Sequence, residues 1–177
     1  MQTKPEYAIT FVDNHDTQPK QSLESFVGAN FKTHAYAFIL LRSQGIPCVF
    51  YADLFGVSYE DGGDENNPEK VVIEKVSFLE QLMRIRKEKA YGFQSDHFDS
   101  PHLIGWTRQG TDDSNPGCAV LLNTGDVTEL SMDMGQKNRD RKMVVVGNNE
   151  LSVTLDENGK GNFTAQGNLV TVYIFQD

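Results

Sequence analysis

The sequence lacks the features that would place it at a membrane or among zinc proteins. No window approaches the ~20 uninterrupted apolar residues of a transmembrane helix, and the start MQTKPEYA lacks the basic and then apolar pattern of a signal peptide. There is no C-x-x-C pair, and the four histidines do not fall at zinc-ligand spacings. We therefore expect no membrane partner, no export signal and no metal site in this chain.

Cysteine and basic residues are also scarce. Cys48 and Cys118 lie 70 residues apart, each within an apolar run, which favours two buried free thiols over a disulfide. Free thiols in turn favour a cytoplasmic location, and an extracellular location stays open for a secreted parent. Sixteen Lys and Arg against 25 Asp and Glu give a formal net charge of −9, whose field repels phosphate backbones and anionic lipid. We therefore expect no nucleic acid partner.

The N-terminal half of the 177 residues alternates strand and helix patterns. Residues 8–12 form an ungapped apolar run typical of a buried strand, the stretch 34–41 is helical and apolar over most of its circumference, and residues 46–51 form a second apolar run. This order predicts a right-handed strand, helix, strand unit with covered strands. Apolar spacing over 73–86 predicts a further helix, with Glu69 in or near its first turn.

The segment SYEDGGDENNP, residues 58–68, lies between these patterns and is acidic and rich in glycine and asparagine. Hard cations such as calcium take oxygen ligands, but the segment does not match the D-x-[DN]-x-[DN]-G-x₅-E spacing that positions them. We therefore favour a solvated loop over a metal site.

Past about Gly92 the hydrophobic period changes from helical to alternating. Short strands are predicted at 103–107, 118–122, 128–132, 142–146, 151–155 and 169–175. Strands at this spacing indicate an antiparallel sandwich. We place the domain boundary so that residues 1–94 form an α/β part and residues 95–177 form an all-β domain.

The stretch FVDNHDTQP, residues 11–19, sets an apolar strand directly against a carboxylate, an amide and an imidazole. The C-terminal ends of strands commonly carry the chemistry of α/β proteins. Taken alone, Asn14, His15 and Asp16 could equally form a hydrogen-bonded turn, with Asp13 or Asp16 capping a neighbouring amide. The motif by itself leaves both interpretations open.

Three further segments make a family resemblance clear. With AYAFILLRSQG, PCVFYADLFG and LIGWTRQG further along the chain, FVDNHDTQP resembles the C-terminal part of bacterial alpha-amylases, which are glycoside hydrolases of alpha-linked glucans. The resemblance implies the last two strand and helix units of a TIM-type (β/α)8 barrel, with strands near 9–12 and 46–51, followed by a C-terminal antiparallel Greek-key β-sandwich.

The resemblance also implies the roles of the site residues. Asp16 would be a third catalytic carboxylate that stabilises an oxocarbenium-like transition state, while His15, Asn14 and Gln18 would bind the sugar. The family's nucleophile and acid/base lie on earlier strands, so the intact form is expected to hydrolyse internal α-1,4 bonds of starch or glycogen with retention, and this chain alone to be inactive. Calcium is expected in the intact parent, and no cofactor in this chain.

Two other functions stay open beside the fragment of an alpha-amylase. One is a non-catalytic carbohydrate-binding or subunit-interaction module, for which Trp106, Tyr51, Tyr59 and Phe98 are candidate stacking residues. Such aromatics are more often core or interface residues, and we expect Trp106 to pack between the domains. The other is an inactive remnant of a truncated gene. α-Glucan (starch, glycogen or maltooligosaccharides) is the expected ligand of the alpha-amylase and of the carbohydrate-binding module.

Two barrel strands without their neighbours would leave open edges and uncovered apolar faces, at Val12, Val49 and Phe50 among others. We therefore expect the isolated chain to self-associate through these faces.

Overall fold

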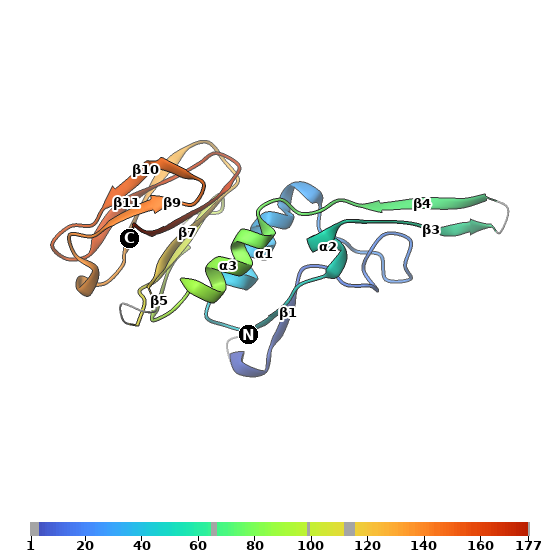
Figure 1. Cartoon of the computed structure of the whole chain (residues 1–177), viewed down its shortest axis with the longest axis horizontal. Helices are drawn as coiled ribbons and strands as arrows, with labels where there is room; N and C mark the ends of the chain where they lie inside the picture. Colours follow the sequence, from blue (N-terminus) through green and yellow to red (C-terminus); the bar gives the residue numbers. More distant parts are fainter. Residues whose placement is uncertain (1–3, 65–66, 99, 112–115, 177) are drawn as a thin grey trace. The chain divides into compact units, whose positions relative to one another are not determined.

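The computed structural model describes residues 4–64, 67–98, 100–111 and 116–176, and it describes side chains outside residues 62–68. The chain forms two compact units (Figure 1). The first comprises Met1–Leu40 and Gln44–Met83, and the second comprises Leu41–Ser43 and Arg84–Asp177. The functional boundary between residues 94 and 95 stays a prediction.

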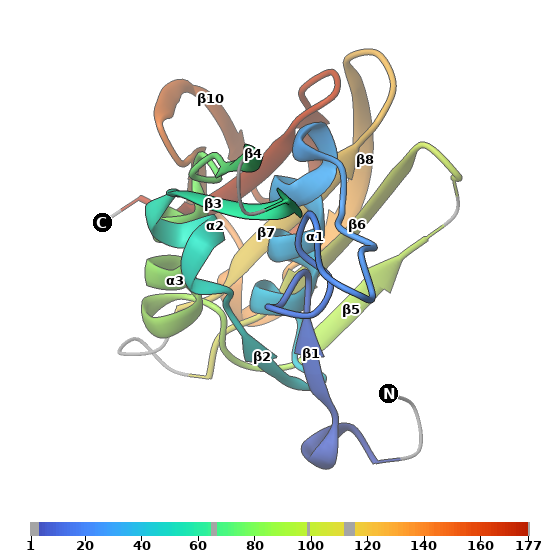
Figure 2. The same cartoon turned by 90° about the vertical axis from the view of Figure 1, so that its right-hand side faces the viewer.

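The first unit contains the predicted strand, helix, strand unit. After the 3-10 turn η1 (Pro5–Tyr7), the elements are β1 (Ile9–Phe11), α1 (Ala29–Leu41) and β2 (Ile46–Cys48). The two strands pair in parallel, with Ile9 opposite Ile46 and Phe11 opposite Cys48 (Figure 2). The second apolar run is not one strand, because its end forms the short helix α2 (Tyr51–Phe55).

The prediction that both strands are covered is wrong. Ile9 is 70% exposed, and Phe11 and Ile46 are also exposed. Cys48 is exposed too, contrary to the expectation of two buried thiols, whereas Cys118 is buried and both cysteines are free. An apolar run identifies a surface suited to burial, but it does not show that a neighbour is present to bury it.

The predicted acidic loop is instead an antiparallel hairpin. Strands β3 (Val57–Asp64) and β4 (Asn67–Ile73) lie side by side in Figure 1, and they pair with Tyr59 opposite Val71. Val71 and Ile73 pack with Ala52 in a small core that Val57 and Tyr59 help to cover. The alternating apolar positions of the two strands therefore outweigh the polar composition of the segment.

The helix predicted over residues 73–86 is shorter than expected. It is α3 (Leu79–Glu88), and both Ile73 and Glu69 belong to β4. The β-branched run from Val71 to Ile73 favours a strand, and its spacing to Val76 only resembles a helical period. Among the residues that the structure describes, no helix is long and apolar enough to cross a membrane.

The second unit is a β domain of two sheets. The larger sheet has the order β10-β9-β12-β7-β6-β5, its strands pair antiparallel, and β8 pairs with β11 in the smaller sheet. The strands are β5 (Gln94–His97), β6 (Leu103–Arg108), β7 (Cys118–Asn123), β8 (Thr128–Asp133), β9 (Lys142–Val145), β10 (Asn148–Thr154), β11 (Lys160–Ala165) and β12 (Val170–Phe175), with the 3-10 turn η2 (Gln136–Asn138) after β8. Every strand predicted after Gly92 is present, and the more polar β5 and β11 were missed.

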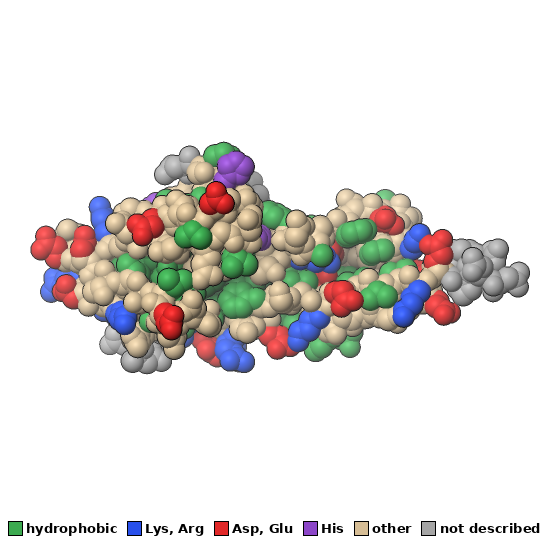
Figure 3. Space-filling model, turned by 90° about the horizontal axis from the view of Figure 1, so that it is seen from above, with side chains coloured by type: hydrophobic (Ala, Val, Ile, Leu, Met, Phe, Trp, Pro, Cys, Tyr) green, Lys and Arg blue, Asp and Glu red, His purple; other side chains and the backbone are tan. Residues whose placement is uncertain are grey.

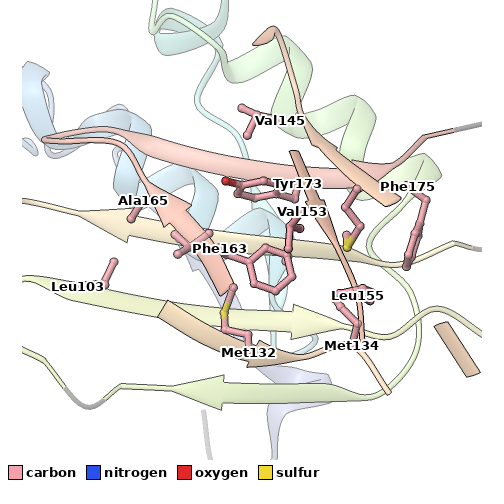
Figure 4. Packing of buried hydrophobic residues seen from close by; sticks show 13 residues of the cluster. Leu103, Met132, Met134, Val145, Val153, Leu155, Phe163, Ala165, Tyr173 and Phe175 are labelled. Atoms are coloured by element: carbon pink, nitrogen blue, oxygen red, sulfur yellow. The ribbon is translucent and has the colours of Figure 1, made fainter. Parts of the chain in front are cut away.

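The core of this unit lies between the two sheets. Figure 4 shows side chains of both sheets pointing into one cluster, among them Met132, Phe163 and Tyr173. The rings of Phe163 and Tyr173 meet edge to face at 82°, with centroids 5.1 Å apart. Such a geometry places the positive edge of one ring against the negative face of the other, so it adds to the hydrophobic gain.

Arg42 anchors the start of this unit. Its guanidinium donates two parallel hydrogen bonds to Asp96, at 2.9 and 2.8 Å, and lies over the rings of Phe98 and Trp106. Trp106 is fully buried, and its indole nitrogen donates to the Leu41 carbonyl at 3.2 Å. The single tryptophan is thus a core residue of the second unit.

Candidate functional site

The FVDNHDTQP stretch forms a tight polar turn at the exit of β1. The Asn14 side-chain oxygen accepts hydrogen bonds from the backbone amides of Asp16 and Thr17, each at 3.0 Å, and the Thr17 hydroxyl accepts one from the Asn14 amide. The backbone N–H of Gln18 donates a hydrogen bond to the backbone carbonyl of Asn14 at 3.1 Å. Asn14 is a residue type that turns the chain through such side-chain bonds, so the local sequence itself defines this turn.

His15 and Asp16 point away from that network. His15 Nε2 lies 3.3 Å from Asp16 Oδ1, and the two side chains are 82% and 52% exposed. The turn therefore presents an imidazole and a carboxylate side by side to solvent, where a sugar hydroxyl or a developing positive charge could meet them. The predicted site residues Asn14, His15, Asp16 and Gln18 are brought together in one turn, and their roles toward a sugar stay a prediction.

Asp13, one residue before the predicted site, is a buried structural group. Its Oδ1 accepts a hydrogen bond from the Val27 amide at 3.0 Å, and its Oδ2 lies 2.7 Å from the ammonium of Lys32. The alternative interpretation, in which an aspartate of this motif caps a neighbouring amide, therefore holds for Asp13.

Lys32 joins Asp13 to a second buried carboxylate. Its ammonium also donates to Asp53 in α2, whose other oxygen accepts a 2.6 Å hydrogen bond from the Tyr36 hydroxyl. The side chains of Asp13, Lys32 and Asp53 are 1%, 10% and 0% exposed. The Tyr36 hydroxyl in turn accepts a bond from the Phe50 amide at 3.4 Å. These residues, Asp13, Lys32, Tyr36 and Asp53, are named the lysine cluster below.

Two groups of the lysine cluster have shifted pKa values. Burial alone would lower the pKa of Lys32, but hydrogen bonds and charge attraction from Asp13 and Asp53 outweigh it and raise that pKa above its ordinary value. Burial, together with the carboxylate of Asp53, strongly raises the pKa of Tyr36. At neutral pH the ammonium is therefore charged and the phenol keeps its proton.

Sequence reasoning did not identify Lys32, Tyr36 or Asp53. A signal was present, because Lys32 and Asp53 are single charges within the largely apolar stretches ANFKTHAYAF and VFYADLF. Charged residues are almost never fully buried unless they are paired, so two opposite charges in two buried segments indicate a partnership.

The outer part of the segment after the turn is held by the hairpin. The Gln21 amide group donates to Asp61 at 2.6 Å, and Lys20 lies 2.5 Å from Glu69 of β4. Both pairs involve solvent-exposed or half-buried groups, so each adds little to stability compared with the lysine cluster.

A cavity of about 260 Å³ opens beside this segment in the first unit. Phe26, Val27 and Thr33 line it together with the β4 exit around Val76, and Lys32 forms part of its wall. Among the described residues, no group of three or more His, Cys, Asp or Glu could hold a metal ion. The calcium expected for an intact parent stays a prediction.

The candidate stacking aromatics differ in exposure. Trp106 is fully buried and cannot stack on a sugar, which agrees with the expectation that it is a packing residue. Tyr59 is half-buried against the small core of the first unit, whereas Tyr51 and Phe98 are exposed.

Comparison with known proteins finds relatives among curated sequences and among solved structures. No protein-family model matches the chain. The chain is 38% identical over 178 aligned residues to the cytoplasmic alpha-amylase of Escherichia coli K12, covering 100% of this chain and 36% of that protein. It is 40% identical over 172 residues to the alpha-amylase of Bacillus licheniformis, covering 96% of this chain and 32% of that protein.

Solved structures show a similar fold. The crystal structure of an alpha-amylase from Geobacillus thermoleovorans complexed with acarbose matches with a TM-score of 0.61 at 16% identity, over 96% of this chain and 39% of that chain. The chain spans about a third of the length of the curated relatives it matches. These matches place the chain with the alpha-amylases, as a counterpart of their C-terminal part.

Proposed function

We propose that this chain is part of an alpha-amylase whose intact form hydrolyses internal α-1,4-glucosidic bonds of starch or glycogen with retention, and that the chain alone is inactive. The observation that carries the proposal is the exposed pair of His15 and Asp16 at the exit of a parallel strand, within a chain that is 38% identical along its whole length to an alpha-amylase.

The chemistry of retention assigns a supporting role to Asp16. Retaining cleavage uses two carboxyl groups about 5–5.5 Å apart, one as nucleophile and one as acid and base. Within the turn, Asp13 is buried against Lys32, so Asp16 is the carboxylate that faces solvent. A fixed carboxylate near developing positive charge stabilises the transition state more than the ground state. His15, Asn14 and Gln18 would orient the sugar around it.

In the proposed parent, β1 and β2 are the seventh and eighth strands of a (β/α)8 barrel, and the second unit is a Greek-key sandwich. The exposed apolar residues of the two strands support this, because Ile9, Phe11 and Ile46 suit a surface that further strands cover. The space-filling view shows hydrophobic side chains at the surface among polar and charged ones (Figure 3).

α-Glucan is the proposed ligand of the intact parent. The G. thermoleovorans alpha-amylase was crystallised with acarbose, which supports a saccharide ligand. The E. coli relative is a cytoplasmic alpha-amylase, which supports the predicted cytoplasmic location. The B. licheniformis relative is described only as an alpha-amylase, so it supports no particular location.

A chimera tests this function. Residues 1–177 would replace the matched part of the E. coli cytoplasmic alpha-amylase, and starch hydrolysis would be measured for the chimera and its Asp16→Asn variant. Loss of a group that stabilises transition-state charge typically costs about 10²–10³ in kcat. We expect a loss of at least that size with maltooligosaccharide binding retained.

Asp126→Asn, at an exposed aspartate of the second unit, is the matched control and should leave kcat unchanged. Full turnover by the Asp16→Asn chimera would overturn the role of Asp16. Starch digestion by the purified 177-residue chain alone would overturn its proposed inactivity.

A further inference from the structure

We propose that Lys32 is a positioning residue for the site, because it holds Asp13 and Asp53 together and thereby fixes the turn that carries Asn14, His15 and Asp16. The proposal rests on the proposed role of Asp16, since a positioned turn matters only if its carboxylate acts on a substrate.

Asp13 holds together the two ends of the segment 13–27, which contains the turn. Asp13 and Val27 lie fourteen residues apart, and the hydrogen bond from the Val27 amide to Asp13 Oδ1 brings the two ends of the segment together. The other oxygen of the same carboxylate faces Lys32. Asp16 follows three residues later, so the orientation of the Asp13 side chain is transmitted to Asp16 through a short, hydrogen-bonded turn.

Lys32 connects this base to the other parallel strand. Phe11 pairs with Cys48, so Asp13 and Asp53 follow the same, C-terminal ends of β1 and β2. Tyr36 lies four residues after Lys32 in α1 and donates to the same Asp53 carboxylate. One helix therefore contacts both strand exits, with the ammonium between two carboxylates and the phenol as a second anchor.

Removal of the ammonium should move Asp13 rather than Asp53. Two buried carboxylates without the cation between them would repel each other. Asp53 lies within α2 and keeps the Tyr36 hydrogen bond, whereas Asp13 lies on an irregular segment held mainly by Lys32 and Val27. The turn that begins at Asn14 should then lose its fixed orientation.

The cavity beside Lys32 allows this idea to be tested by chemical rescue. Lys32 forms part of the wall of the 260 Å³ cavity, so shortening it to alanine would extend an existing opening. A small alkylammonium ion such as n-propylammonium could then enter and lie between the two carboxylates. Lys75 also lines this cavity, but its ammonium pairs at the surface with Glu80 at 2.8 Å, so Lys75→Ala is the matched control.

The first experiment uses the full 177-residue chain. Amide exchange measured by NMR should become faster at Val27 and Thr17 in Lys32→Ala, relative to amides within α1, and should recover on addition of n-propylammonium chloride but not of n-propanol. Lys75→Ala should leave both amides unchanged. Unchanged exchange at Val27 and Thr17 in a folded Lys32→Ala chain would overturn the proposal.

The second experiment uses the chimera and separates kcat from KM. A misplacement of about 1 Å can cost about 10²-fold in rate, so we expect Lys32→Ala to lower kcat by about 10- to 100-fold while KM changes little. n-Propylammonium should restore part of kcat. If Lys32→Ala does not fold, Lys32→Met, which keeps the length of the stem and lacks the charge, should show the same loss, and Asp53→Asn a smaller one.

The outcomes distinguish the two proposals. An unchanged kcat in a folded Lys32→Ala or Lys32→Met chimera, with Asp16→Asn inactive, would overturn the positioning role alone. An active Asp16→Asn chimera would instead overturn the proposed function. A change in KM without a change in kcat would assign Lys32 to binding and would also contradict positioning.

Discussion

At the scale of single residues, the same carboxylate chemistry serves two purposes within four positions. Asp13 is buried and holds a backbone amide and an ammonium, while Asp16 faces solvent beside His15. Identity of side chain therefore does not decide the role of either residue. The surroundings of each carboxylate do, because Asp13 lies against the Val27 amide and Lys32, whereas the Asp16 side chain is 52% exposed.

The two cysteines should differ sharply in reactivity. Burial raises the pKa of the Cys118 thiol to about 12, so almost no thiolate forms at neutral pH, whereas Cys48 is exposed. We expect Ellman's reagent to modify one thiol in the folded chain and two in guanidinium chloride. The folded Cys48→Ser variant should give no rapid reaction, and two rapidly reacting thiols in the folded protein would contradict the burial of Cys118.

Folding stability should decrease at alkaline pH. The folded-state pKa values of Cys118, Tyr36 and Lys32 all lie above their ordinary values of 9.0, 10.0 and 10.5, so above about pH 9 the folded chain binds more protons than the unfolded chain. The stabilisation is therefore complete below pH 9 and is lost as the pH rises. Urea denaturation across pH 8–11.5 should show a falling free energy of unfolding.

Tyr36→Phe separates the contribution of the phenol. The variant should be about 1–3 kcal/mol less stable at neutral pH, because it loses a hydrogen bond to a charged partner. Its free energy of unfolding should also fall less steeply above pH 10. Tyr7→Phe, at an exposed tyrosine, is the control, and equal slopes in Tyr36→Phe and the parent chain would rule out the raised pKa of Tyr36.

The sequence pointed to the residues of the turn, but it did not reveal the buried lysine cluster beneath them. FVDNHDTQP marks the candidate site because polar residues follow an apolar strand, and that signal is local. The lysine cluster is not local, since Lys32 bonds to residues 19 and 21 positions away, at Asp13 and Asp53. Such pairing depends on which helix face turns inward, and apolar residues over most of the circumference of the later part of α1 conceal that face.

At the scale of elements, errors of prediction occur where composition and pattern disagree. The β3 and β4 hairpin was predicted as a loop because residues 58–68 are acidic and contain glycine, although Val57 and Tyr59 face Ile73 and Val71 across the ladder. Conversely, β5 and β11 were missed because their sequences QSDH and KGNFTA are largely polar. Pairing partners define such strands, and partners distant in the chain are not visible in a local window.

The smaller sheet of the second unit should depend on one aromatic side chain. Phe163 in β11 is fully buried and meets the Tyr173 ring of the larger sheet, so Phe163→Ala leaves a cavity between the sheets and should cost about 3–5 kcal/mol. Urea denaturation followed by circular dichroism would measure the loss. Val127→Ala, at an exposed position before β8, should change stability by less than about 0.5 kcal/mol. A similar stability for both variants would contradict a core between the sheets.

At the scale of the whole molecule, an apolar strand pair without neighbours should govern solution behaviour. Parallel strands are normally buried on both faces, yet within the described part of the chain β1 and β2 pair only with each other and expose apolar side chains. An open edge of this kind is a template for another strand. The proposed parent would cover it with the rest of its barrel, and another copy of this chain could cover it in part.

We therefore expect the 177-residue chain to self-associate at micromolar concentration, as sedimentation velocity would detect. Ile9 and Ile46 are exposed and lie opposite each other in the ladder, so Ile9→Lys with Ile46→Lys places two charges on one face and should shift the chain toward monomer. Val127→Lys, which adds a charge at an exposed apolar position of the second unit, should leave the distribution unchanged. A compact monomer of the unmodified chain would contradict the expectation, because an exposed parallel pair would then be tolerated in water without a partner.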